Sequence, residues 1–154
     1  MFSLTIEANR TNLDKVVEFI DKELIKFECT SELKTKVDIA VEEIFVNISR
    51  YAYDEYGEVG IDCNVNEDTF MIEIEFKDRG KPYDPLKRTD PDISKTIEER
   101  EIGGLGIFMT KKFMDEIEYK YEENKNVIII RKKIKWGEEI KWRNGFLQWF
   151  SQWF

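Results

Sequence analysis

The sequence predicts an α+β fold, a two-layer sandwich in which helices pack on one face of a mostly antiparallel or mixed sheet. Two apolar periodicities indicate it: strict alternation, typical of half-buried strands, and recurrence every three or four residues, typical of one helix face. The segments follow in the order strand, helix, helix, strand, strand, long loop, helix, strand, strand, which favours such a sandwich. We therefore expect one domain over residues 1–134 of the 154-residue chain, followed by a separate segment, 135–154.

The N-terminal segment predicts one strand followed by one helix. Residues from Phe2 to Glu7 alternate apolar and polar side chains, and the residues from Asn9 to Asn12 supply turn and cap chemistry. The helix extends from Leu13 to near Cys29, because apolar residues recur there at helical spacing. These residues are Leu13, Val16, Val17, Ile20, Leu24 and Phe27.

A second helix is predicted to begin at a Thr30-Ser31 cap, with Glu32 in its first turn. Its apolar positions define a single buried stripe, which requires that this helix packs on the core along one face. The stripe consists of Leu33, Val37, Ala40, Val41, Ile44, Ile48 and Ala52.

A β-hairpin follows the second helix. Gly57 and Gly60 interrupt the helical pattern, and Val59 to Val65 alternates as a strand does. After a turn at 66–68, the return strand is expected from Thr69 to Lys77 and to stop at Asp78. Its predicted buried face consists of Phe70, Ile72, Ile74 and Phe76.

The rest of the domain predicts a long loop, a helix and two strands. The stretch from Arg79 to Ile102 contains all three prolines and many charges, so we expect a surface loop of functional importance. Glycines at 103, 104 and 106 are expected to open a third helix, which ends near Asp115. The last strands are predicted at 117–121 and 127–134, joined by a turn over 122–126.

Composition excludes several classes of function. The net charge of −8 opposes nonspecific binding to a phosphate backbone, so nucleic acid is a poor partner. The absence of histidine excludes an imidazole base, a phosphohistidine and a histidine metal ligand. Two cysteines are too few for a disulfide framework or a four-ligand zinc site, and no secretion signal or membrane-spanning segment is evident. We expect a cytoplasmic protein.

Glu43 and Asn47 form the first candidate site. They lie four residues apart on the second predicted helix and project from one side of it, beside the core stripe. An amide oxygen is a suitable ligand for Mg²⁺, and a carboxylate one turn away can accept a proton from an attacking hydroxyl. The alternative interpretation is a solvated polar flank of the helix.

Asp78 and Gly80 form the second candidate site, directly after a predicted buried strand. A carboxylate at a strand end can accept a hydrogen bond from the exocyclic amino group of adenine, and the glycine lets the backbone approach a planar ring. The alternative is an ordinary turn, since Asp, Gly and Pro are common turn residues.

The third candidate site is the glycine-rich start of the third helix. Helix N-termini present unpaired N–H groups, so glycines there allow phosphate oxygens to approach the backbone. The residues are Gly103, Gly104, Leu105, Gly106 and Ile107. They match neither the P-loop nor the Rossmann pattern, and the alternative interpretation is a flexible hinge.

In this order, the three sites resemble the N, G1 and G2 boxes of the GHKL (Bergerat-fold) ATPases. The residues that carry the resemblance are Glu43-xxx-Asn47, Asp78-x-Gly80-x-Pro82 and Gly104-x-Gly106. The surrounding sequences AVEEIFVNISRYAY, FKDRGKPYDP and GGLGIFMTKKFMDEIEY are most similar to the anti-sigma-factor serine kinases of this superfamily. The similarity covers about residues 1–134 and implies the Bergerat ATP-binding fold.

The resemblance implies a role for each matching residue. Asn47 would coordinate Mg²⁺, Asp78 would bind the adenine of ATP or ADP, and Glu43 would be the general base. The nucleotide pocket would be shaped by Gly80, Gly103, Gly104, Leu105, Gly106 and Ile107. Arg100 and Lys95 are candidates to meet the γ-phosphate from the loop, although each is also explained as a solvated charge.

The resemblance also implies partners. In that family the phosphate acceptor is a serine of an anti-anti-sigma protein with a STAS fold, and the kinase otherwise holds a sigma factor inactive. We expect a homodimer. The alternative is a non-catalytic module that uses ATP or ADP only to set its conformation. A histidine-kinase catalytic domain is a third possibility, but without histidine this chain lacks a phosphoacceptor.

The C-terminal segment departs from the family pattern. Aromatic residues recur there at helical spacing, which predicts an interface helix with an aromatic stripe. They are Trp142, Phe146, Trp149, Phe150 and Trp153, preceded by several Lys and Arg residues. Packing on its own domain or a dimer mate, binding in a partner's groove, and lying on an anionic membrane surface remain open.

Overall fold

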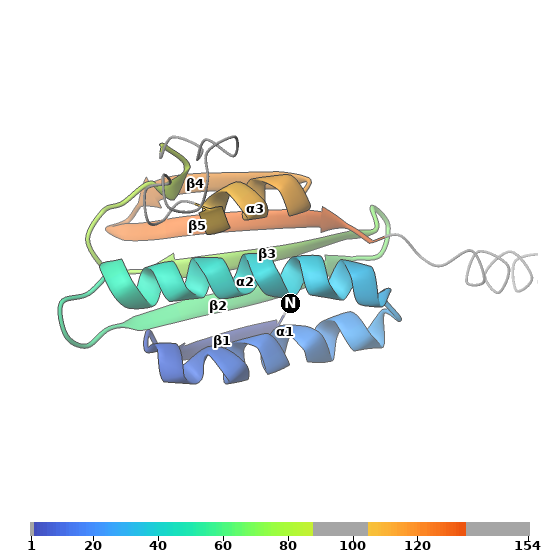
Figure 1. The fold of residues 1–154 in the computed structure, drawn as a ribbon, viewed down its shortest axis with the longest axis horizontal. Helices are drawn as coiled ribbons and strands as arrows, with labels where there is room; N and C mark the ends of the chain where they lie inside the picture. The colour runs from blue at the N-terminus through green and yellow to red at the C-terminus, as the bar shows by residue number, and fades with distance from the viewer. Residues whose placement is uncertain (1, 88–104, 135–154) are drawn as a thin grey trace, which may run out of the picture.

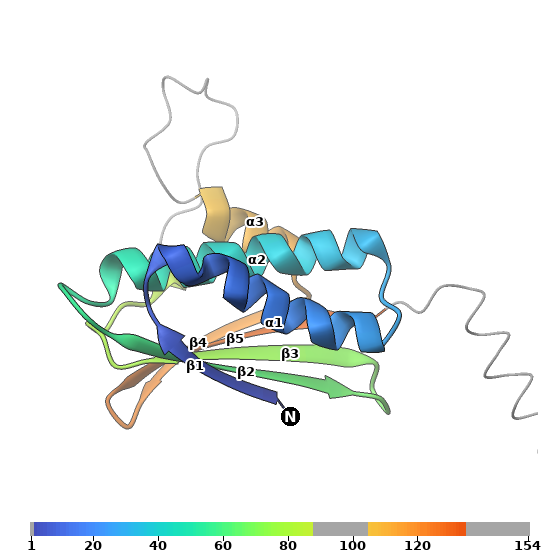
Figure 2. The same ribbon diagram turned by 90° about the horizontal axis from the view of Figure 1, so that it is seen from below.

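The computed structural model describes residues 2–87 and 105–134, which form two layers (Figure 1). A five-stranded sheet is one layer, and the helices cover one of its faces, as Figure 2 shows from below. The strands are β1 (Phe2–Glu7), β2 (Glu58–Asn66), β3 (Met71–Asp78), β4 (Glu116–Glu122) and β5 (Lys125–Lys133). The helices are α1 (Leu13–Lys26), α2 (Ser31–Tyr51) and α3 (Leu105–Phe113), with 3-10 turns at Arg10–Asn12 and Pro85–Lys87. The predicted α+β sandwich is confirmed.

The sheet has the order β1-β2-β3-β5-β4, and every pairing among the described strands is antiparallel. The central strand is β3, which pairs with β2 on one side and with β5 on the other. The register places Asp78, the last residue of β3, between Val59 of β2 and Asn126 of β5. The pairing therefore fixes Asp78 at one end of the middle of the sheet.

Helix α2 begins as the sequence predicts. Thr30 is its N-cap residue, and its hydroxyl accepts a hydrogen bond of 3.2 Å from the backbone N–H of Leu33. All seven residues of the predicted stripe are buried, and Phe45 and Val46 are buried as well. The buried arc is wider than predicted because α2 packs against α3 as well as α1 above the sheet (Figure 1).

The sequence predicted Phe70 on the buried face of β3, and this prediction is wrong. Its backbone φ is 52°, its side chain is 44% exposed, and β3 begins only at Met71. The left-handed conformation belongs to the turn that precedes the strand, so the alternation of buried residues starts at Ile72.

Parts of the predicted loop and tail lie outside the described residues: 88–102 of the loop, including Lys95 and Arg100, and all of 135–154. Within the described ranges, none of the helices combines the length and the apolar composition that crossing a bilayer requires.

Candidate functional site

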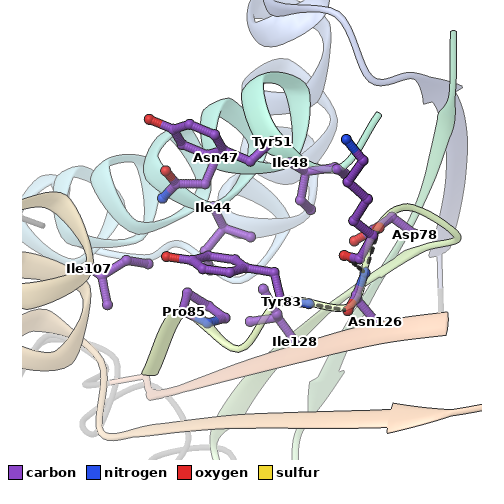
Figure 3. A pocket seen from close by; sticks show the side chains of 12 residues that line it. Ile44, Asn47, Ile48, Tyr51, Asp78, Tyr83, Pro85, Ile107, Asn126 and Ile128 are labelled. Carbon is purple, nitrogen blue, oxygen red and sulfur yellow. Dashed lines mark hydrogen bonds between the residues drawn. The ribbon is translucent and has the colours of Figure 1, made fainter. Parts of the chain in front are cut away.

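A cavity opens between α2, the start of α3 and the end of the sheet that contains Asp78 (Figure 3). The lining residues are Ile44, Asn47, Ile48, Tyr51, Ala52, Asp78, Lys81, Tyr83, Pro85, Ile107, Asn126 and Ile128. Most of these side chains are apolar or aromatic, and two amides, one carboxylate and the amine of Lys81 are set among them, so the lining suits a flat ring with a few polar edges.

The structure brings one residue of each of the three predicted sites to this cavity: Asn47, Asp78 and Ile107. They come from α2, β3 and α3, which are far apart in sequence. Leu105 is 49% exposed and does not line the cavity. Gly103, Gly104 and Arg100 lie outside the described residues.

Glu43 and Asn47 contact each other on the half-buried flank of α2. The Asn47 Nδ2 atom donates a hydrogen bond of 2.8 Å to Glu43 Oε1. This bond fixes the amide with its nitrogen toward the carboxylate, so its oxygen is the atom that remains for a cation. Asn47 lines the cavity, whereas Glu43 is not among the lining residues.

Gly106 lies directly against Glu43. A Cβ atom built on Gly106 would overlap the Glu43 carboxylate, so only a glycine leaves room for that carboxylate between α2 and α3. Gly80 is equally close to the end of α2, where an added Cβ would overlap the backbone of Ala52. Both predicted glycines thus permit a close approach to α2.

Asp78 is buried, and both hydrogen bonds that the described residues donate to it end on Oδ1. The donors are the Gly80 backbone N–H and Asn126 Nδ2, each at 2.9 Å. Burial raises the pKa of Asp78, and these two hydrogen bonds lower it in part. Oδ2 is left as the carboxylate oxygen that can accept a donor from a molecule in the cavity.

Asn126 is a site residue that the sequence reasoning missed. It is only 3% exposed, and its amide makes four hydrogen bonds. Nδ2 donates to Asp78 Oδ1 and to the Lys81 carbonyl, and Oδ1 accepts from the Tyr83 N–H and the Tyr119 hydroxyl. Its full donor and acceptor capacity is therefore used to hold Asp78 and the chain that follows it.

The predicted turn over 122–126 is too long. Strand β4 runs to Glu122 and β5 begins at Lys125, so Asn126 is a strand residue directly opposite Asp78. The available signal was that Asn126, a polar residue, directly precedes the apolar run 127–130. This signal points to the site only once the β3–β5 register, which pairs Asn126 with Asp78, is known.

The described residues contain no group of three or more His, Cys, Asp or Glu side chains arranged to hold a metal ion. Asn47 Oδ1 is the suitable oxygen at the cavity, and one amide cannot hold Mg²⁺ alone. A cation that keeps several waters and takes further oxygen ligands from a bound phosphate chain fits this donor set.

A family model described as "Histidine kinase-like ATPase domain" matches residues 6–132 of the chain. The match begins in β1 and ends in β5, and it therefore includes all three predicted sites.

Curated relatives match at moderate identity, and the three described here are each named "Serine-protein kinase RsbW". The protein from Halalkalibacterium halodurans is 33% identical over 108 residues, covering 68% of this chain and 64% of its own length. One from Listeria monocytogenes is 29% identical over 111 residues, covering 68% and 67%. One from Bacillus cereus is 36% identical over 98 residues, covering 60% of each. The chain thus spans about two thirds or less of the length of these relatives.

Among solved structures, the chain resembles a crystal structure of the RsbU and RsbW domains of a Mycobacterium tuberculosis protein. The TM-score is 0.60 at 12% identity, and the match covers 89% of this chain and 34% of that one. At this identity the likeness concerns the fold alone.

Proposed function

The chain belongs to the histidine kinase-like ATPase domain family, and from this premise we propose that it is an ATP-dependent protein serine kinase of the anti-sigma-factor type. ATP or ADP is its nucleotide, and Mg²⁺ accompanies it. The observation that carries the proposal is that Asn47, Asp78 and Ile107 line one cavity. Those residues come from the three separate sequence motifs that resemble the nucleotide boxes of the family.

Asp78 recognises the base in this proposal. Its Oδ1 is occupied by Gly80 and Asn126, so Oδ2 accepts a hydrogen bond from the adenine 6-amino group. Apolar side chains from α2, α3 and β5 provide flat contacts for the ring: Ile44, Ile48, Ile107 and Ile128. The start of α3, next to Gly106, meets the phosphates with backbone N–H groups.

Glu43 is the base for transfer. The serine hydroxyl of the acceptor attacks the γ-phosphorus, the bond from that phosphorus to the β–γ bridging oxygen breaks, and the hydroxyl proton passes to Glu43. Asn47 Oδ1 would help to hold a Mg²⁺ ion, which would supply positive charge to offset the charge that develops on the phosphate chain. The hydrogen bond from Asn47 to Glu43 keeps the base one helical turn from the cation ligand.

The acceptor is a serine of an anti-anti-sigma protein with a STAS fold, and a sigma factor is the second partner. The relatives described above are named serine-protein kinase, which supports serine as the acceptor residue. Phosphorylation adds charge to the acceptor and weakens its contact with the kinase. The proposal also includes that the protein forms a homodimer and that it acts in the cytoplasm.

The test is to mix the full chain with Mg-ATP and STAS proteins encoded by neighbouring genes, and to measure phosphoserine on each by intact mass. Transfer is expected with the unchanged chain. Glu43→Ala should still bind nucleotide and fail to transfer, whereas Glu42→Ala, at the exposed neighbouring position on α2, should transfer normally. Nucleotide binding without transfer to any STAS protein would instead identify a non-catalytic module that switches protein contacts. Absence of nucleotide binding would reject both functions.

A further inference from the structure

Tyr53 lies outside the cavity but holds the loop that follows Asp78. Its hydroxyl donates a hydrogen bond of 2.7 Å to the Glu58 carbonyl and accepts one of 2.8 Å from the Arg79 N–H. The side chain therefore links the residue after α2's cap to the start of β2 and the end of β3. Because Arg79 directly follows Asp78, this contact acts on the backbone of the proposed base-binding residue.

The ring of Tyr53 packs closely against Gly57. A Cβ atom built on this buried glycine would overlap the Tyr53 ring, so the ring lies flat on the glycine backbone. Burial raises the pKa of Tyr53, and the hydroxyl therefore stays protonated and able to donate to Glu58 at neutral pH.

Three consecutive backbone N–H groups after Asp78 are all bonded. The Arg79 N–H donates to the Tyr53 hydroxyl and the Gly80 N–H donates to Asp78 Oδ1. The Lys81 N–H donates to the Ala52 carbonyl at 2.8 Å. Two of the three acceptors therefore belong to Ala52 and Tyr53, the two residues that follow α2.

This arrangement connects the two halves of the proposed site. Helix α2 carries Glu43 and Asn47, and the two residues that follow it hold the loop behind Asp78. We propose that Tyr53 is a positioning residue for base recognition: its hydroxyl fixes the Arg79 backbone and thereby the depth at which Asp78 meets the base. The inference rests on the proposed nucleotide function.

Tyr53→Phe is the variant that tests it, because it keeps the ring on Gly57 and removes only the hydroxyl. The dissociation constants of ATP and of purine riboside triphosphate, which lacks the 6-amino group, are measured by calorimetry on the full chain. We expect the preference for ATP to fall by about threefold to tenfold, the effect of one weakened hydrogen bond. Backbone amide exchange at Arg79 should quicken at the same time.

Tyr56→Phe is the matched control. Tyr56 is 66% exposed, and its hydroxyl donates to the Glu58 carboxylate rather than to the backbone of the loop. Its removal should leave the preference for ATP unchanged. Thermal unfolding of both variants checks that the fold is intact.

Two results would overturn the positioning role. One is an unchanged ratio of the two dissociation constants in Tyr53→Phe, and the other is an equal weakening of both nucleotides, as a purely structural residue would give. Failure of the unchanged chain to bind either nucleotide would reject the proposed function itself, and this inference with it.

Discussion

Asn126 Nδ2 donates a hydrogen bond of 2.9 Å to Asp78 Oδ1, which joins the start of β5 to the last residue of β3. Both side chains are buried, at 3% and 4% exposure. Since the Gly80 N–H meets the same oxygen, the carboxylate cannot rotate without losing two hydrogen bonds. The orientation of Asp78 is thus set by the protein before any ligand binds.

Asn126→Asp should destabilise the protein by about 3 kcal/mol at neutral pH, because it removes two donors and places a second carboxylate against Asp78. Urea unfolding followed by circular dichroism measures the loss, which should shrink at low pH as one carboxyl becomes protonated. Asn124→Asp, in the exposed turn between β4 and β5, should cost little. Equal stabilities of the two variants would contradict the role assigned to Asn126.

Asp78→Asn should weaken ATP binding by about tenfold to a hundredfold without unfolding the protein. The amide oxygen of the new side chain can accept both hydrogen bonds that now reach Oδ1, so its NH₂ group faces the adenine amino group, and two donors meet. Calorimetry measures the affinity, with the exposed Asp68→Asn as the control. Unchanged affinity in Asp78→Asn would reject the adenine assignment.

Binding should also depend on pH through Asp78. Its pKa is raised above the ordinary value of 3.8, so the folded state holds this proton more tightly than the unfolded state. The stability that this proton gives is present below the ordinary pKa and is lost as the pH rises through the raised pKa. ATP affinity should change in the opposite sense, falling as the pH drops through the raised pKa and the charged acceptor disappears.

The difference in ATP affinity between the unchanged chain and Asp78→Asn isolates this effect, because titration of the ATP phosphates is common to both. A difference that stays constant from neutral pH down to the acid limit of folding would assign the pH dependence to another group.

Gly106→Ala and Gly80→Ala should have contrasting effects. An added methyl at Gly106 meets the mobile end of Glu43, so the free energy of unfolding should change by no more than about 1 kcal/mol, while phosphate transfer falls because Glu43 is displaced. At Gly80 it meets the backbone of Ala52, which should cost about 1–3 kcal/mol of stability. Urea unfolding and the transfer assay separate the two outcomes, and a larger stability loss for Gly106→Ala would reverse the interpretation.

Cys63 should resist thiol reagents while the protein is folded. It is fully buried, and burial raises the pKa of its thiol to about 12, so almost no thiolate exists at pH 8. Cys29→Ser leaves Cys63 as the one cysteine of the chain. Ellman's reagent should then detect no thiol in the folded protein and one after denaturation in guanidinium. Rapid reaction of the folded variant would show that this part of the core opens readily.

The helices and strands were predictable because each carries a local signal. In α2 the Thr30 cap and the spacing of the apolar residues depend only on neighbours in sequence, and both are found in the structure. Phe70 was assigned wrongly because alternation alone does not reveal where a turn ends, and its positive φ follows from the hairpin geometry.

The candidate site was predictable only where a residue belongs to a sequence motif. Asn47 and Asp78 were proposed from such motifs, and both line the cavity. Asn126 and Tyr83 were not proposed, because Asn126 reaches the cavity through strand register and Tyr83 through the path of the chain after β3. Long-range pairing of this kind leaves no periodic trace in the sequence.

The position of Asp78 at the end of the central strand has a consequence for how the protein opens. Strand β3 is paired on both edges, so its hydrogen bonds break only when β2 or β5 separates from it. In native-state hydrogen exchange, the amides of this strand should therefore exchange only through global unfolding, later than those of the edge strands β1 and β4. A ligand must then enter and leave the cavity through movements of parts of the protein other than β3, while this strand keeps its shape.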